Sequence, residues 1–144
     1  MSTPAKEVAF EGLRGVQGSP IIALQFREMD GPRTVAIGMG PNDAWKIMGV
    51  LEEKSLRQKA GEQFDPALSF FLFLGQFMQS VESKIDRLVI TGYDGNMWKA
   101  TLSVDGPQGP REIVCRASDG VALAMAAEAK VYATDEALSH QPGD

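Results

Sequence analysis

Cysteine and histidine are nearly absent from this sequence of 144 residues, which contains one of each. A single cysteine, Cys115, cannot form an internal disulfide, which excludes a disulfide-stapled secreted scaffold. A single histidine, His140, excludes hydrolysis by a pair of histidines acting as acid and base. Chemistry in this chain therefore has to rely on carboxylates, hydroxyls and basic side chains.

Long apolar runs are also missing. The longest apolar cluster, residues 67–78, is interrupted by Ser69, Gly75 and Gln76 and falls short of the ~20 residues needed to cross a bilayer. The sequence does not open with a basic segment followed by an apolar run, as a secretory signal would. We therefore expect no membrane association and a cytoplasmic, reducing location.

Positive charge is scarce. Fourteen basic residues stand against nineteen acidic ones, for a formal charge of −5, which disfavours general binding to a phosphate backbone. A local basic patch can override the net charge, because screening limits the reach of each charge to about 10 Å at ~0.1 M salt. The candidate patches are small: Arg27 with Arg33, Lys54 with Arg57 and Lys59, and Arg111 with Arg116.

The length and the composition favour one folded domain. A chain of 144 residues leaves no room for two independent cores. Its 44% hydrophobic and 23% charged residues are those of an ordinary globular protein. We expect an ordered domain over residues 7–139, with flexible ends at 1–6 and 140–144.

Strand and helix signals alternate in blocks. Hairpin-type turns at Asp30-Gly31 and at 93–96 join apolar strand runs, and Pro41 and Pro66 mark helix starts. We predict strands at 8–13, 21–26, 34–37, 85–91, 97–104, 112–116 and 130–133, helices at 41–59, 66–81 and 118–129, and a final turn at 135–138. This order predicts an α+β fold with a mixed, largely antiparallel sheet and helices packed against it.

The second predicted helix is apolar nearly all round. Between Phe70 and Phe77 it carries four phenylalanines and two leucines. Such a surface either lies between the sheet and other helices or is covered by a partner subunit. The sequence leaves both readings open, and the second predicts a homodimer formed through this helix.

The last part of the domain carries the most specific pattern. Residues 113–138 read IVCRASDGVALAMAAEAKVYATDEAL, and this segment resembles the signature of the bifunctional nuclease family: a strand ending in Arg-Pro-Ser-Asp, an alanine-rich helix and a short strand with tyrosine. Ala36-Ile37-Gly38 with Asp43-Ala44, and the hairpin 88–102 with Asp94-Gly95 and Trp98, resemble two further family segments.

Three departures from the family pattern are visible. Ala117 replaces the proline of Arg-Pro-Ser-Asp, Asp43 replaces a glutamate, and residues 59–66, KAGEQFDP, lack the family's Arg-Pro-x-Thr-His-Asp segment. The resemblance implies a nuclease that acts on DNA and RNA, and a dimer. The missing histidine segment leaves a carboxylate route to hydrolysis.

The candidate catalytic residues are Asp119, Arg116 and Ser118. Asp119 opens a helix directly after a strand that ends in Arg116, so the helix N-terminus favours a phosphate that Arg116 can bind bidentately. The structural alternative is that Ser118 is an ordinary N-cap and that Arg116 simply pairs with Asp119.

Asp119, Asp43 and Asp94 are the candidate ligands for Mg²⁺ or Mn²⁺. Asp43 in a first helical turn and Asp94 in a tight Asp-Gly turn also have ordinary structural explanations. We read Lys99 as solvated, Cys115 as a small buried residue, His140 as a solvated tail residue and Gly38-Met39-Gly40 as a loop.

Two hypotheses follow. In the first, the protein is a metal-dependent nuclease for DNA or RNA that uses these carboxylates and Arg116. In the second, it is a non-catalytic domain that dimerises or binds a protein partner through the Phe70–Phe77 helix.

Overall fold

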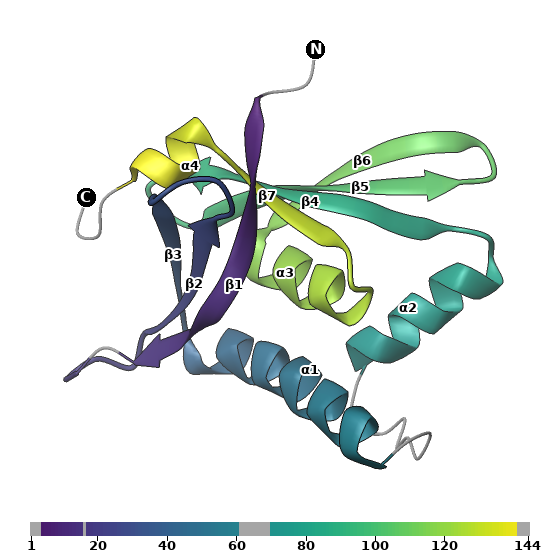
Figure 1. Cartoon of the computed structure of the whole chain (residues 1–144), viewed down its shortest axis with the longest axis horizontal. Coiled ribbons are helices and arrows are strands. Elements are labelled where there is room, and N and C mark those ends of the chain that lie inside the picture. Colours follow the sequence, from purple (N-terminus) through teal and green to yellow (C-terminus); the bar gives the residue numbers. More distant parts are fainter. Residues whose placement is uncertain (1–3, 16, 61–69, 141–144) are drawn as a thin grey trace.

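The computed structural model describes residues 4–15, 17–60 and 70–140. In these ranges a seven-stranded sheet is covered by helices in a single domain (Figure 1). The elements run in the order β1 (Ala5–Gly15), β2 (Ile22–Glu28), β3 (Thr34–Met39), α1 (Pro41–Ala60), α2 (Phe70–Ser80), β4 (Lys84–Tyr93), β5 (Trp98–Gly106), β6 (Gly109–Arg116), α3 (Ala117–Ala126), β7 (Lys130–Thr134) and α4 (Asp135–Ser139).

The sheet consists of two antiparallel meanders joined by the last strand. Its order is β3-β2-β1-β7-β4-β5-β6, and every neighbouring pair is antiparallel except β4 and β7. β7 inserts between β1 and β4 because the chain crosses back through α3, as a parallel connection requires. The predicted α+β fold with a mixed, largely antiparallel sheet is confirmed.

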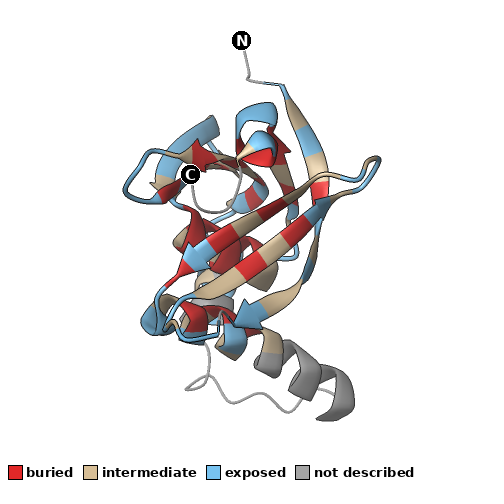
Figure 2. Ribbon diagram, turned by 90° about the vertical axis from the view of Figure 1, so that its left-hand side faces the viewer, coloured by how far each residue is buried: buried red, intermediate tan, exposed pale blue. Residues whose placement is uncertain are grey.

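α3 lies at the centre of the fold. The sheet is strongly twisted between β1 and β4, and α3 sits in its concave side with α1 and α2 beside it (Figure 1). The alanine-rich sequence of α3 permits this close packing, since Ala117, Ala122 and Ala124 are fully buried. Buried residues recur along the strands over the helix (Figure 2), as the alternation in β5 predicts: Trp98, Ala100 and Leu102 are buried while Lys99 is exposed.

Several boundaries differ from the predicted ones. β1 begins at Ala5, which pairs with Thr134, so the ordered domain reaches into the segment 1–6 that was expected to be flexible. α3 ends at Ala126 and not at 129, because the chain turns out of the helix through Glu128, whose φ is 58°. The start predicted for the second helix at 66 lies outside the described residues. None of the described helices combines the length and the hydropathy needed to span a membrane.

α4 is held against the sheet by its first turn. The Thr134 hydroxyl accepts a hydrogen bond from the Ala137 amide at 3.2 Å and donates one to the Thr91 carbonyl at 2.9 Å. Arg33, directly before β3, forms an ion pair with Asp135 at 2.9 Å. These contacts fix the position of α4 relative to β4. They thereby also fix His140, the residue that follows the helix.

Gly120 sets how closely α3 approaches the sheet. A Cβ at this position would lie 2.6 Å from Leu88 Cδ1 and 3.0 Å from Cys115 Sγ, and Leu88 is fully buried. We expect Gly120→Ala to lower the free energy of unfolding by ~1–3 kcal/mol, as overpacked cores do. Urea denaturation monitored by circular dichroism measures the change.

The matched control is Gly49→Ala in α1, where an added Cβ has open space. This variant should be stabilised by about 0.5–1 kcal/mol, because alanine is the better helix former. Equal stability of the two variants would contradict the packing constraint at Gly120.

Candidate active site

Three of the predicted site residues meet where β6 runs into α3. Arg116 is the last residue of β6, and Asp119 lies in the first turn of α3. Asp43 lies in the first turn of α1, which starts immediately after β3 and Gly40. The close packing of α1 on α3 brings the two first turns together from positions 76 residues apart along the chain (119 minus 43).

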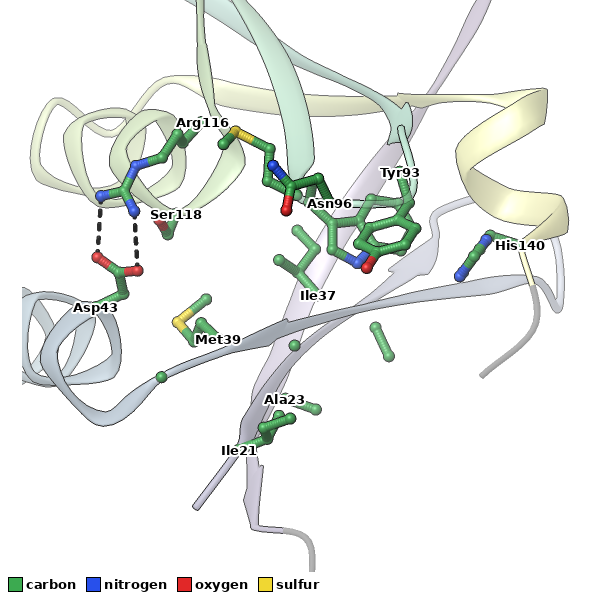
Figure 3. A pocket seen from close by; sticks show the side chains of 15 residues that line it. Ile21, Ala23, Ile37, Met39, Asp43, Tyr93, Asn96, Arg116, Ser118 and His140 are labelled. Carbon is green, nitrogen blue, oxygen red and sulfur yellow. Dashed lines mark hydrogen bonds and ion pairs between the residues drawn. The ribbon is translucent and has the colours of Figure 1, made fainter. Parts of the chain in front are cut away.

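Arg116 binds both carboxylates. Its Nη1 and Nη2 donate to the two oxygens of Asp43 at 3.2 and 3.1 Å, and its Nε and Nη2 donate to those of Asp119 at 3.1 and 3.2 Å. The bidentate pair with Asp43 is drawn in Figure 3. The guanidinium matches two carboxylates because its donors form a planar fork.

Lys46 completes the site, and sequence reasoning missed it. Its Nζ lies 3.3 Å from Asp43 Oδ1 and 3.2 Å from Asp119 Oδ1. The signal was present in the sequence, since Lys46 follows Asp43 by three residues on α1 and therefore lies on the same helical face. Arg116, Lys46, Asp43 and Asp119, from here on the charge cluster, carry two positive and two negative charges.

The charge cluster shifts the pKa values of its members. Hydrogen bonds to Asp119 and Asp43 raise the pKa of Lys46 and of Arg116 above their usual values. Burial acts to raise the pKa of Asp119, but the hydrogen bonds from Arg116 and Lys46 outweigh it and lower that pKa. Asp119 is therefore an ionised carboxylate whose low pKa depends on its two cationic neighbours.

Ser118 is not the N-cap of α3 that the structural alternative predicted. α3 begins at Ala117, so the N-cap position belongs to Arg116, and no side chain caps the helix there. The strand continues into the helix without a loop, which leaves no position for Ser118 outside the first turn. Ser118 is instead buried and contributes to the wall of a pocket.

The pocket has a volume of about 670 Å³ and opens beside the charge cluster. Arg116, Asp43 and Ser118 line one end, while Tyr93, Trp98 and His140 line the other (Figure 3). Apolar residues of β2 and β3, among them Ala23, Ala36, Ile37 and Met39, form its floor. The pocket thus combines a charged end, from here on the polar end, with an aromatic end.

The aromatic end is built by the β4–β5 hairpin and by α4. A bulge at Gly92, which has a φ of 149°, shifts the register so that Tyr93 faces Trp98 across the two strands. The ring centroids of Tyr93 and Trp98 are 5.8 Å apart, and the His140 ring lies 5.3 Å from Tyr93 and 5.1 Å from Trp98. The prediction that His140 is a solvated tail residue is therefore wrong, because two aromatic rings hold it at the end of α4.

Asp94 does not join the charge cluster. Its carboxylate accepts hydrogen bonds from the Met97 and Asn96 amides at 2.8 and 2.9 Å and pairs with Lys99 at 3.2 Å. These two backbone hydrogen bonds, followed by the one from Lys99, lower the pKa of Asp94 to about 2. Asp94 is occupied in stabilising the hairpin turn, and Lys99, read from the sequence as solvated, is its partner.

The predicted three-carboxylate metal site is not assembled. Among the side chains that the structure describes, no three His, Cys, Asp or Glu residues converge in a way that could hold a metal ion. The two carboxylates that do converge, Asp43 and Asp119, already share two cations. A divalent ion at this position would have to displace Arg116 and Lys46, so the donor set does not fit such an ion as it stands.

Two further residue sets also differ in part from expectation. Gly38 and Met39 end strand β3, and both line the pocket together with Gly40, where the sequence suggested a loop. Cys115 is half-buried on β6, and burial raises the pKa of its thiol. It is therefore a protonated packing residue, only half-buried where the sequence indicated a buried one.

A comparison with protein-family models matches residues 24–142 to the bifunctional nuclease domain. The match covers nearly the whole chain, and the protein therefore belongs to the bifunctional nuclease domain family. A search of the curated proteins found no match.

The pKa of Asp119 depends on Arg116 and Lys46, so removing one of them should change it. Arg116→Gln removes the larger of the two hydrogen-bonding influences that oppose burial, so the pKa of Asp119 should rise. NMR titration of the Asp119 carboxyl carbon measures it, with Arg111→Gln, on the same strand, as the control. An unchanged pKa in Arg116→Gln would show that the charge cluster does not form in solution.

The lowered pKa of Asp119 makes the stability of the fold depend on pH. The Asp119 ion pairs stabilise the wild-type fold above the unfolded-state pKa of about 3.9. This stabilisation is lost as the pH falls through the lower folded-state pKa. It is small, because 41% of the Asp119 side chain and 42% of the Arg116 side chain are exposed to solvent.

Proposed function

We propose that the protein is a nuclease that hydrolyses phosphodiesters of single-stranded DNA or RNA. The observation that carries this proposal is the convergence of Arg116 and Lys46 with Asp43 and Asp119 at the polar end of the pocket. Membership of the bifunctional nuclease domain family supports it. The half-buried free thiol of Cys115 is consistent with a reducing compartment, and we propose a cytoplasmic location.

A phosphate binds by exchanging partners within the charge cluster. Arg116 and Lys46 are the two donors, and both are partly exposed, with 42% and 38% of their side chains accessible. The planar fork of Arg116 fits two phosphate oxygens as well as it fits a carboxylate. A phosphodiester that takes these donors displaces Asp43 and Asp119 from them.

The exchange of partners also prepares Asp119 to act as a general base. Asp119 owes its low pKa to Arg116 and Lys46, while burial acts in the opposite direction. When the phosphate takes the two cations, the pKa of Asp119 rises and the carboxylate becomes a better acceptor for the proton of an attacking water. Arg116 and Lys46 meanwhile stabilise the negative charge that grows on the phosphoryl oxygens. The new P–O bond to water forms as the P–O bond to the leaving sugar oxygen breaks, and that oxygen takes a proton from solvent water.

No step of this scheme is assigned to a metal ion. Mg²⁺ or Mn²⁺ at Asp43 and Asp119 would compete with Arg116 and Lys46 for the same oxygens. Cleavage with Mg²⁺, with Mn²⁺ and with EDTA therefore has to be compared to show whether a metal ion takes part.

The test is cleavage of labelled single-stranded DNA and RNA by purified protein, with Mg²⁺, Mn²⁺ or EDTA. We expect Arg116→Ala and Asp119→Asn each to lower the rate by about 10²-fold or more, because each removes a group that acts in the transition state. Arg111→Ala, on the same strand but hydrogen-bonded to Gln108, should leave the rate unchanged. No cleavage by the wild type under any of the three conditions would refute the nuclease, and full activity of Asp119→Asn would refute the role of Asp119 as its base.

A second candidate function is supported by an exposed apolar stripe on α2. Phe73, Phe77 and Val81 are spaced four residues apart on one helical face, and they expose 50%, 54% and 47% of their surface. The Val81 amide continues the helical hydrogen bonds to the Phe77 carbonyl at 3.2 Å. Because an exposed stripe of this kind favours association, we propose that the domain forms a homodimer through this surface.

The expected result is a dimer for the wild type and a monomer for the double variant Phe73→Ser, Phe77→Ser in sedimentation velocity. The physical reason is the loss of apolar surface that only a partner buries. Trp45→Ser on α1, which removes a side chain that is 68% exposed, is the matched control and should stay dimeric. A wild type that sediments as a monomer at high concentration would contradict the homodimer.

A further inference from the structure

The aromatic end of the pocket has no part in the charge exchange described above. It consists of Tyr93, Trp98 and His140, with the side chain of Asn96 beside them (Figure 3). His140 and Tyr93 are half-buried, while Trp98 is 8% exposed. The half-buried rings of Tyr93 and His140, which pack against Trp98 and line the cavity, offer surfaces on which a flat ligand can stack.

The polar groups at this end can hydrogen-bond a heterocycle. The Asn96 amide has both donors and an acceptor, the Tyr93 hydroxyl is both, and the His140 imidazole has a nitrogen of each kind when neutral. In the described structure the side-chain amide of Asn96 has no hydrogen bond, since it is the Asn96 backbone amide that binds Asp94. A ring that carries both donors and acceptors on its edge matches this set better than an apolar ligand does.

The two ends together define the ligand. The same pocket of about 670 Å³ holds Arg116 at its polar end and the three rings at its aromatic end, over an apolar floor that includes Ile37 and Met39. A nucleotide, an aromatic heterocycle linked through a sugar to a phosphate, matches both ends. Its base would stack in the aromatic end while its phosphate replaces the carboxylates on Arg116.

We infer that the aromatic end binds one unpaired base of a single-stranded nucleic acid. This inference rests on the proposed function, because it takes the phosphate at Arg116 to be the one that is hydrolysed. A base within a duplex is stacked and paired, and it must be flipped out before it can enter such a pocket. The pocket therefore selects single strands and extruded bases over intact duplex.

Tryptophan fluorescence reports directly on this pocket. The chain has two tryptophans, Trp98 in the aromatic end and Trp45, 68% exposed, on α1. In Trp45→Phe, Trp98 becomes the single reporter. A single-stranded oligodeoxynucleotide of eight thymidines is titrated into this variant in EDTA, beside the same length of abasic sugar-phosphate and a blunt duplex.

We expect the thymidine strand to quench Trp98 and to bind at least about fivefold more tightly than the abasic strand, since a base stacked on an aromatic side chain adds affinity that the abasic strand cannot gain. His140→Ala should reduce this preference, whereas Met29→Ala on the β2–β3 turn should not. Thermal melts of each variant show that the fold is retained. The duplex should bind no better than the abasic strand.

Base binding and phosphodiester cleavage can fail independently of each other. Quenching of Trp98 with the expected preference, but without cleavage of any substrate, would leave the base site in place and remove the nuclease. Cleavage that is equally fast on strands with and without bases flanking the scissile bond, or equal binding of the thymidine and abasic strands, overturns the base site. Failure of every strand to bind overturns it as well.

Discussion

The contact between Gly120 of α3 and Leu88 of β4 determines how the rest of the molecule is arranged. With only a hydrogen at this position, α3 lies close enough to the sheet for Cys115 Sγ to contact it as well. The helix can then follow β6 without a loop, so Arg116 ends the strand and Asp119 lies in the next turn. α1 packs on the same helix, and Asp43 and Lys46 reach the same point from the other side. The charge cluster is therefore a consequence of backbone packing in the core.

The balance of charge within the cluster determines what it can do. Two cations and two carboxylates satisfy one another, so the resting cluster neither attracts an anion strongly nor presents a vacant set of ligands for a cation. The side chains of these ion pairs are 20% to 42% exposed, and exposed pairs each contribute roughly 0–1 kcal/mol, so their exchange for another anion costs little. A cluster with these properties is stable when empty and can be reorganised by a ligand that competes for the guanidinium.

The fold could be predicted further than the site. Turn signals at Asp30-Gly31 and 93–96, the alternation in β5 and the alanine-rich helix are local patterns, and each led to the element that the structure contains. Asp43, Arg116 and Asp119 were found because each stands at the end of an element, where helix dipoles and strand termini concentrate polar groups. The sequence resemblance pointed to the family that the wider comparison identifies.

The remaining site residues could not be predicted because their roles depend on long-range contacts. Lys46 has a helical spacing from Asp43 that many solvated lysines share, and only the packing of α1 on α3 brings it to Asp119. His140 follows a helix of five residues whose position depends on Thr134, Thr91 and Asp135. The residue type of Ser118 suggests an N-cap, but β6 continues directly into α3, so Arg116 occupies the N-cap position. No local pattern contains this information.

The source of affinity for a nucleic acid follows from these charges. The chain carries a net charge of −5, and a phosphate at Arg116 would displace two carboxylates that stay nearby, so electrostatics alone cannot hold the ligand firmly. Displacement of Asp43 and Asp119 leaves two carboxylates next to the phosphate, and their repulsion weakens its binding. Binding free energy must then come from the aromatic end, where stacking and the release of water from apolar surface do not depend on net charge. The affinity of a protein with this charge should depend more on the bases of the nucleic acid than on its phosphates, which is the reverse of a basic nucleic-acid binder.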